Sequence, residues 1–107
     1  MVFHHLIEQP DREIIPGYRA RFLHTEHLTL AYWEVEQDAP LPEHSHPHEQ
    51  VAQVLEGKYQ LTVDGETRTL QPGDAAVIPG GVPHSGLALT VCRLLDVFHP
   101  VREEYRS

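Results

Sequence analysis

The chain has 107 residues, 40% of them hydrophobic, and a formal net charge of −8 from 16 acidic and 8 basic residues. A chain of this length can form one domain with a modest core and is too short for two. The acidic balance argues against nucleic acid as a partner, and no basic run or long apolar stretch predicts a membrane partner or a signal peptide. The single cysteine, Cys92, cannot form an internal disulfide, which favours a reducing, cytoplasmic location.

The pattern of apolar residues and turns predicts an all-β protein. No window shows sustained helical periodicity, and turn signals recur about every eight to twelve residues, which is typical of a sandwich or barrel. Residues 1–16 are polar and are expected to form an N-terminal extension that could pair with a partner chain, and residues 17–107 the barrel domain. The segments expected to form strands are 18–22, 28–36, 43–46, 50–55, 58–63, 66–70, 75–78, 84–89 and 90–98.

Several short segments are expected to lie outside the strands. Asp64-Gly65 is the strongest hairpin signal, whereas Pro40 and Pro42 predict a break, because proline cannot donate to a β-ladder. The segment 24–27 carries two histidines at helical spacing, but it is too short for a helix and is expected to be a surface turn. Residues 100–107 are expected to form a charged tail.

A cluster of polar residues at 43–50 carries the strongest chemical signal. In an extended strand His44 and His46 point to the same side, and a turn after His46 would bring Gln50 into the next strand beside them. His84 is distant in sequence, but it follows a Pro-Gly-Gly-Val-Pro corner that could bring it to the same place. Three imidazoles and a carboxamide make a plausible ligand set for a divalent metal.

Alternatives to this metal site remain open at the level of the residues. His44 and His46 could be exposed histidines in a polar loop, and Gln50 could mark a site that has become a metal-free binding barrel. As a ligand, the neutral carboxamide would leave the metal its full charge and make it a stronger Lewis acid. Alternation places Glu49 on the opposite face from Gln50, and the turn leaves the direction of His48 undetermined.

The two segments resemble the two motifs of the cupin superfamily. The first has Gln50 where most members have Glu, and Ala88 replaces the usual final Asn of the second. The resemblance implies a double-stranded β-helix, which is a small jelly-roll barrel, and one metal site that could take nickel, iron, manganese or zinc. The residues at the motif positions are His44, His46, Gln50 and Gly57 in the first segment, and Gly73, Pro79, Gly81 and His84 in the second.

The last predicted strand carries an acid among apolar residues. Asp96 shares a face with Cys92, Leu94 and Phe98. If this face lines the interior, burial would raise the pKa of Asp96 while a metal and nearby cations would lower it, which suits a general acid or base. An Asp that only caps a strand end is the alternative. The opposite face of the strand is also largely apolar, and a two-layer barrel buries one face, so a homodimer or a covering N-terminal strand is expected.

The segments 44–50 and 95–103 together resemble the KdgF-type cupins, which linearise unsaturated uronates from pectin or alginate. This resemblance implies that His44, His46, Gln50 and His84 hold the metal, and that Asp96, Phe98 and Arg102 line the active site. Asp96 would then move protons, Arg102 would pair with the substrate carboxylate, and Phe98 would wall the sugar. His99 is a departure, since a small residue is expected there.

The sequence therefore predicts a metal-dependent enzyme whose partner is a small anionic sugar, with neither nucleic acid nor membrane involved. It would convert 4,5-unsaturated monouronates to linear 5-keto-4-deoxyuronates. Two other functions stay open. A metal-dependent cupin dioxygenase would need a redox metal and would consume oxygen, and a non-catalytic sugar- or anion-binding barrel would bind a ligand without turnover.

Overall fold

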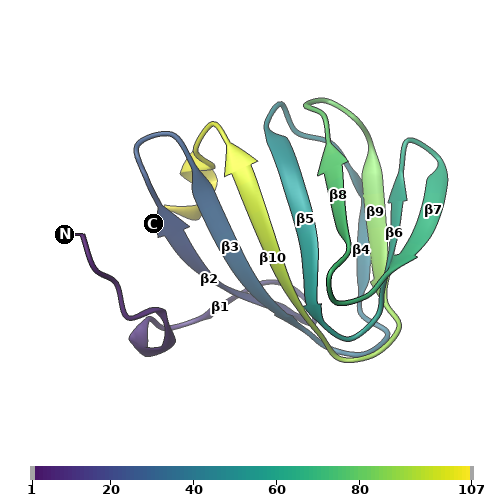
Figure 1. Cartoon of the computed structure of the whole chain (residues 1–107), viewed down its shortest axis with the longest axis horizontal. Helices are drawn as coiled ribbons and strands as arrows, with labels where there is room; N and C mark the ends of the chain where they lie inside the picture. Colours follow the sequence, from purple (N-terminus) through teal and green to yellow (C-terminus); the bar gives the residue numbers. More distant parts are fainter. Residues whose placement is uncertain (1, 107) are drawn as a thin grey trace.

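The computed structural model describes residues 2–106 as a single all-β body, with ten strands and two single-turn 3-10 helices among those residues (Figure 1). This confirms the predicted all-β barrel. The strands are β1 Arg12–Ile15, β2 Tyr18–His24, β3 Thr29–Val35, β4 Pro40–His44, β5 Glu49–Glu56, β6 Tyr59–Val63, β7 Glu66–Leu70, β8 Ala75–Ile78, β9 His84–Ala88 and β10 Cys92–His99, and the helices are η1 Leu6–Glu8 and η2 Glu103–Tyr105.

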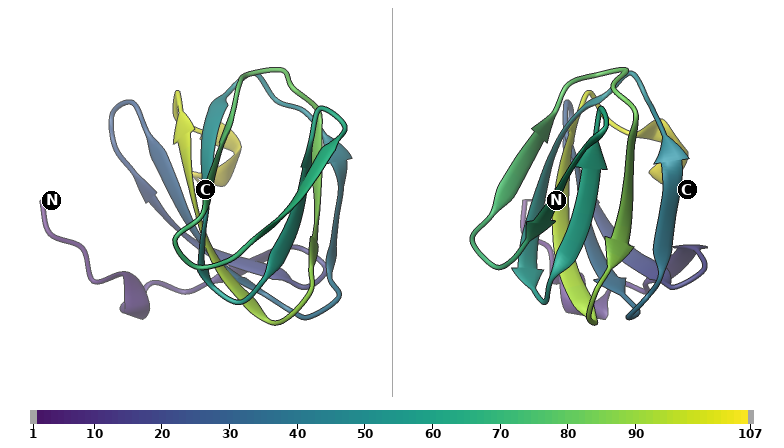
Figure 2. Two further views of the ribbon diagram at one scale, coloured as in Figure 1. Left: turned by 45° about the vertical axis from the view of Figure 1, so that its right-hand side comes forward. Right: turned by 90° about the vertical axis from the view of Figure 1, so that its right-hand side faces the viewer.

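Two antiparallel sheets form opposite walls of the barrel (Figure 2). One sheet has six strands in the order β1-β2-β3-β10-β5-β8, and the other has four in the order β4-β9-β6-β7. Neighbours such as β3 and β10 are distant in sequence, so the sheets are assembled by long-range pairing. Within residues 2–106, no helix is long and apolar enough to span a membrane.

The core lies between the two sheets and follows the alternation of the strands. On β10 the inward side chains of Leu94 and Phe98 are buried, and Leu94 pairs across the sheet with Trp33 of β3. At one end of the barrel the hydroxyls of Tyr18 and Tyr59 lie 2.7 Å apart and join β2 to β6. This hydrogen bond connects the two walls without leaving either buried hydroxyl unpaired.

The predicted break after residue 36 is present, but its predicted extent through Pro42 is wrong, because both Pro40 and Pro42 belong to β4. This strand lies at the edge of the four-stranded sheet and pairs only with β9. Proline is tolerated on an edge strand, where a missing N–H can face away from the ladder. The strand also ends at His44, so that His46 lies two residues beyond it rather than within a strand.

The predicted charged tail is also wrong as far as the structure describes it. Val101 and Arg102 are only 8% and 9% exposed, and the following helix η2 packs against the barrel. The ring of Tyr105 stacks on Phe22 with centroids 4.6 Å apart and meets Trp33 edge-on. His24, expected on the surface, is partly buried beneath this turn. Residues 101–105 are therefore part of the barrel wall.

The N-terminal extension divides into two parts. Its last part forms β1, which pairs with β2 of the same chain. The residues before η1 project away from the barrel (Figure 1), whereas Gln9, which follows η1, is hydrogen-bonded to β2. This first segment and η1 carry the exposed apolar side chains of Val2, Phe3 and Ile7. Met1 lies outside the described residues. Pairing of this extension with a partner chain stays a prediction.

The outer face of the six-stranded sheet carries an apolar row that crosses five strands. Each member is the register partner of the next, from β2 through β3, β10 and β5 to β8. A continuous apolar row on the outside of a sheet is uncommon in a monomer. We propose that this row is the interface of a homodimer. The row consists of Leu23, Leu30, Val97, Val51 and Val77.

A charge at the centre of this row should break the dimer. Val97→Lys is expected to convert a dimer to a monomer in light scattering at micromolar concentration, because an unpaired ammonium would have to be buried in the interface. Val91→Lys is the matched control, since Val91 is 66% exposed and lies off the row. A wild-type protein of monomer mass would contradict the proposal.

Candidate functional site

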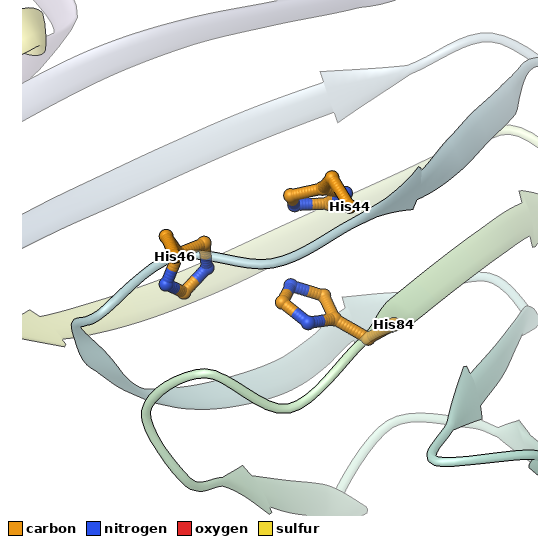
Figure 3. A group of neighbouring side chains, drawn as sticks. All are labelled: His44, His46 and His84. Atoms are coloured by element: carbon orange, nitrogen blue, oxygen red, sulfur yellow. The ribbon is translucent and has the colours of Figure 1, made fainter.

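Three histidines from two strands and a loop converge at one end of the barrel (Figure 3). His44 ends β4 and pairs in register with His84, which begins β9, and their ring centroids are 4.3 Å apart. His46 lies in the loop after β4, with its ring 4.9 Å from that of His84. One nitrogen from each ring can be chosen so that all three lie within 4.8 Å of one another. This is the spacing of ligands around one ion.

A contact between two loops places His46 although no strand carries it. The backbone N–H of Gly81 donates to the carbonyl of His46 at 2.7 Å. A side chain at the neighbouring Gly80 would collide with the carbonyl of Pro47. The Pro-Gly-Gly corner therefore fits closely against the histidine loop. Sequence reasoning placed His44 and His46 on one strand, but their rings converge because this corner supports the loop.

Backbone carbonyls fix the tautomer of all three histidines. Nδ1 of His44 lies 2.9 Å from the carbonyl of Pro42, and Nδ1 of His84 lies 2.9 Å from that of Val82. Nδ1 of His46 lies 3.0 Å from the carbonyl of His48. A carbonyl only accepts, so each Nδ1 carries the proton and each Nε2 presents a lone pair. Metal-binding histidines are commonly oriented in this way.

The unpaired lone pairs at the centre of the cluster fit a bound cation. Nε2 of His84 is buried and has no hydrogen-bond partner among the described residues. Nε2 of His46 lies 3.1 Å from Oε1 of Gln50, which is 7% exposed and faces inward on β5. Both of these atoms are acceptors, so no proton joins them, whereas a divalent ion would satisfy both. His44, His46, Gln50 and His84 are thus brought together as one ligand set, with Glu49 exposed on the outer side.

Burial keeps two of the ligands in the neutral form that a metal requires. Desolvation, with smaller contributions from Arg102 and His84, lowers the pKa of His46 to about 4. Desolvation also lowers the pKa of His84. His48 lies beside His46, with ring centroids 5.6 Å apart, but it is outside the converging set. Near neutral pH, protons therefore do not compete for the lone pairs of His46.

Asp96 lies partly buried in the wall of the same cavity. Desolvation raises its pKa to about 6, while the Gln50 carboxamide, the Trp33 indole and Arg102 act in the opposite direction. Relative to the ordinary value of 3.8, this disfavours the ionised form by about 3 kcal/mol. A carboxyl group with such a pKa can both give and take a proton near neutral pH.

The position of Gln50 explains why a carboxamide suits this site better than a carboxylate. Its oxygen is directed to the histidines, which leaves its NH₂ group to stabilise the Asp96 carboxylate. A glutamate at this position would place a second negative charge beside Asp96 and raise the pKa of that carboxyl further. The carboxamide therefore offers an oxygen ligand to the metal site and a hydrogen-bond donor to Asp96.

Arg102 brings a buried cation to the cavity between two aromatic rings. Its Cζ lies 4.7 Å from the centroid of Phe98 and 4.6 Å from that of Tyr105. Nε of Arg102 lies 3.2 Å from a carboxylate oxygen of Glu104. The Phe98 ring also meets His46 edge-on, with centroids 5.7 Å apart, which places the guanidinium near the histidine cluster.

Sequence reasoning missed two residues of this site. Tyr105 lies in the segment that was expected to be a charged tail. Its closeness to Arg102 in the sequence was the only signal that could have indicated it. Trp33 was seen only as a strand residue, but its buried indole N–H faces Asp96 and favours the ionised form of that carboxyl. Both side chains line the cavity. His99, by contrast, is exposed on the outer side of β10.

The cavity has a volume of about 330 Å³ and extends from the histidines into the barrel. Its outer end is polar, with the histidines, Gln50, Asp96 and Arg102. Its inner end is apolar and is lined by Ile14, Leu61, Leu70 and Leu94, among others. This size lies near the lower end of the range for small-molecule sites, roughly 300–1,000 Å³, and suits a single sugar ring better than an oligosaccharide.

Comparison with known proteins agrees with this geometry. The cupin domain matches residues 31–98, which include all four predicted metal ligands. This chain belongs to the cupin family. The crystal structure of an RmlC-like cupin from Shewanella frigidimarina is 28% identical, with a TM-score of 0.93 over 98% of this cupin and 96% of that chain. KdgF from Halomonas sp. is 29% identical, with a TM-score of 0.91 over 97% of both chains.

A curated relative matches a shorter part of this cupin. Quercetin 2,3-dioxygenase of Bacillus subtilis is 52% identical over 46 residues, which are 43% of this chain and 13% of the dioxygenase. The match thus spans a small part of that protein's length. The relatives in these comparisons include enzymes, and the cluster of three histidines provides a site for a divalent metal.

Removing two of the histidines should abolish metal binding. Wild-type protein is expected to contain one divalent ion per chain by elemental analysis, and a His46→Ala, His84→Ala double variant essentially none, because two converging lone pairs are lost. A His27→Ala, His99→Ala double variant is the control, since both histidines are exposed and away from the cluster. Undiminished metal in the first variant would show that the ion binds elsewhere.

Proposed function

We propose that this cupin is a metal-dependent enzyme that converts 4,5-unsaturated monouronates into linear 5-keto-4-deoxyuronates. The observation that carries the proposal is a combination in one small cavity. A metal-ligand set, a carboxyl group with a pKa of about 6 and a buried guanidinium line the same space. The likeness to KdgF from Halomonas, which extends over 97% of both chains, supports the same reaction.

The reaction is an isomerisation and needs no external oxidant or reductant. The unsaturated ring is a cyclic hemiacetal whose ring oxygen is bonded to C5 of the C4=C5 double bond. Loss of the proton from the C1 hydroxyl forms the C1 carbonyl and breaks the bond between C1 and the ring oxygen, which leaves an enolate at C5. One proton added at C4 then gives the C5 ketone.

The residues of the cavity match the demands of these steps. Arg102 can pair with the substrate carboxylate, for which the planar guanidinium offers two parallel donors. Asp96 can take the proton from the C1 hydroxyl and supply one at C4, because its pKa of about 6 permits both protonation states. Phe98 can pack against the sugar ring. A bound divalent ion would supply a Lewis acid for the carboxylate and enolate oxygens.

Local charge offsets the acidic surface for an anionic substrate. The chain has a net charge of −8, which repels a uronate at long range. Within the cavity, Arg102 and a divalent ion would provide positive charge in a desolvated space, where electrostatic attraction is stronger than in water. We therefore expect recognition to depend on this site rather than on the protein's overall electrostatic field.

A reducing, cytoplasmic location fits Cys92, which is buried and is a free cysteine without a disulfide.

The second candidate function is that of a metal-dependent dioxygenase. The 52% identity to part of quercetin 2,3-dioxygenase favours it, as does the apolar inner end of the cavity, which could take an aromatic ring. A dioxygenase would consume oxygen and require a redox metal, whereas the isomerisation would proceed under anaerobic conditions. Activity on the uronate without oxygen therefore separates the two functions.

The proposal is tested by the ultraviolet absorbance of the C4=C5 double bond. Metal-loaded wild-type protein is expected to accelerate its loss from unsaturated galacturonate, and Asp96→Asn to lower the rate by about 10²–10⁴-fold, because the amide cannot transfer the proton. Bound metal and substrate affinity should remain. An inactive wild type would exclude the reaction, and a fully active Asp96→Asn would assign the proton transfer to another group.

Loss of the planar guanidinium should mainly affect binding. Arg102→Lys keeps the positive charge but loses paired contact with the carboxylate and stacking between the rings, so KM should rise by about tenfold with a smaller change in kcat. Steady-state kinetics measure the changes in KM and kcat separately. Arg93→Lys is the control, because Arg93 is exposed on the outer face of β10. An unchanged KM would remove Arg102 from the binding site.

A further inference from the structure

The turn that presents Arg102 is attached to the barrel by hydrogen bonds to residues that do not line the cavity. The backbone N–H of Arg102 donates to Oγ1 of Thr29 at 2.9 Å, and this hydrogen bond is buried. The carbonyl of Tyr105 accepts from Nη2 of Arg12 at 2.7 Å, and Nε2 of His24 lies 3.3 Å from it. Both ends of the segment 102–105 are therefore attached to β1, β2 and β3.

Thr29 is the centre of this attachment. It begins β3, is 0% exposed and is the register partner of both His24 on β2 and Phe98 on β10. Its hydroxyl lies 2.9 Å from Nδ1 of His24. A fully buried hydroxyl with two polar partners is costly to replace by an apolar group, because each partner would lose its hydrogen bond.

The donors and acceptors of this network have one consistent direction in the neutral form of His24. The Tyr105 carbonyl can only accept, so Nε2 of His24 donates to it and Nδ1 becomes an acceptor. The Thr29 hydroxyl must then donate its proton to Nδ1, which leaves its oxygen free to accept from the N–H of Arg102. The role of each group as donor or acceptor thus determines the role of the next, from Tyr105 through His24 and Thr29 to Arg102.

We propose that Thr29 and His24 are positioning residues, which hold the C-terminal turn so that the Arg102 guanidinium stays between Phe98 and Tyr105 at the cavity. The inference rests on the proposed function for the identity of the ligand that Arg102 binds, a uronate carboxylate. Arginine has a long and flexible side chain, and fixing both its backbone and its stacking partners reduces the entropy lost on binding. Neither Thr29 nor His24 needs to touch the substrate.

Thr29→Val tests the proposal because valine keeps the branched shape and loses only the hydroxyl. Thr29→Ser restores the hydroxyl and should rescue the effects of its loss. Thr62→Val is the control, since the Thr62 hydroxyl bonds to Thr67 on the exposed face of the other sheet. If Thr29→Val fails to fold, His24→Phe is the second variant, because it keeps a ring beside Phe22 and loses both nitrogens.

Two NMR readouts report the position of Arg102 without any turnover. In metal-loaded wild-type protein the Arg102 amide is expected to be protected from hydrogen exchange, and its side-chain protons to be shifted by the two rings that flank it. Thr29→Val should lose about tenfold or more of that protection and move the side-chain signals toward unshifted values. Amides of the β3–β10 pairs should keep theirs, which shows that the barrel is intact.

Kinetics then connect this position to binding. Thr29→Val should raise KM for unsaturated galacturonate by about tenfold with kcat nearly unchanged, and it should add little to Arg102→Lys, because both act through the same guanidinium. Unchanged Arg102 signals in Thr29→Val would overturn the proposal, as would a KM effect fully additive to that of Arg102→Lys. If wild-type protein does not act on the uronate, the proposed function fails alone, and the NMR signals still decide whether Thr29 positions Arg102.

Discussion

The structure of the site depends on acceptor atoms that face one another. Once Nδ1 of each histidine donates to a backbone carbonyl, three Nε2 lone pairs and the oxygen of Gln50 are directed into a common space. Acceptors that face one another, of which those of His84 and Gln50 belong to buried residues, are unfavourable until a cation lies between them. The features that create it are the register of β4 with β9 and the close contact of two loops. The fold therefore sets the direction of these four acceptors.

The same arrangement explains how a metal site and a proton-transfer group can share one small cavity. A carboxylate ligand would bind a cation more strongly, but it would also repel the Asp96 carboxylate. The carboxamide of Gln50 avoids this conflict, because its oxygen and its NH₂ group act on opposite sides. A metal held there would be more weakly neutralised and would lie beside an acid whose pKa is about 6, and both properties would suit the proposed stabilisation of an enolate.

The sequence predicted those parts of the fold that depend on local pattern. Alternation located most strands, and Asp64-Gly65 does connect β6 to β7 as a tight turn. The predictions failed where long-range contacts decide. The prolines at 40 and 42 fit β4 only because this strand lies at an edge. The burial of Tyr105 depends on Phe22 and Trp33, more than seventy residues earlier. The convergence of the three histidines was predictable because motif spacing records their geometry, whereas Trp33 belongs to no motif.

Arg102 presents an electrostatic problem that the C-terminal turn resolves. A divalent ion at the histidines would repel this guanidinium. After desolvation, Arg102 is the next cause of the lowered pKa of His46. Two aromatic faces each contribute about 0.5–2 kcal/mol to a cation between them, and Glu104 supplies a compensating negative charge on the Nε side. The cation can then remain at the cavity when no anion is bound. A carboxylate that enters the cavity would be attracted by both a bound metal and Arg102. Its negative charge would offset the repulsion between these two cations.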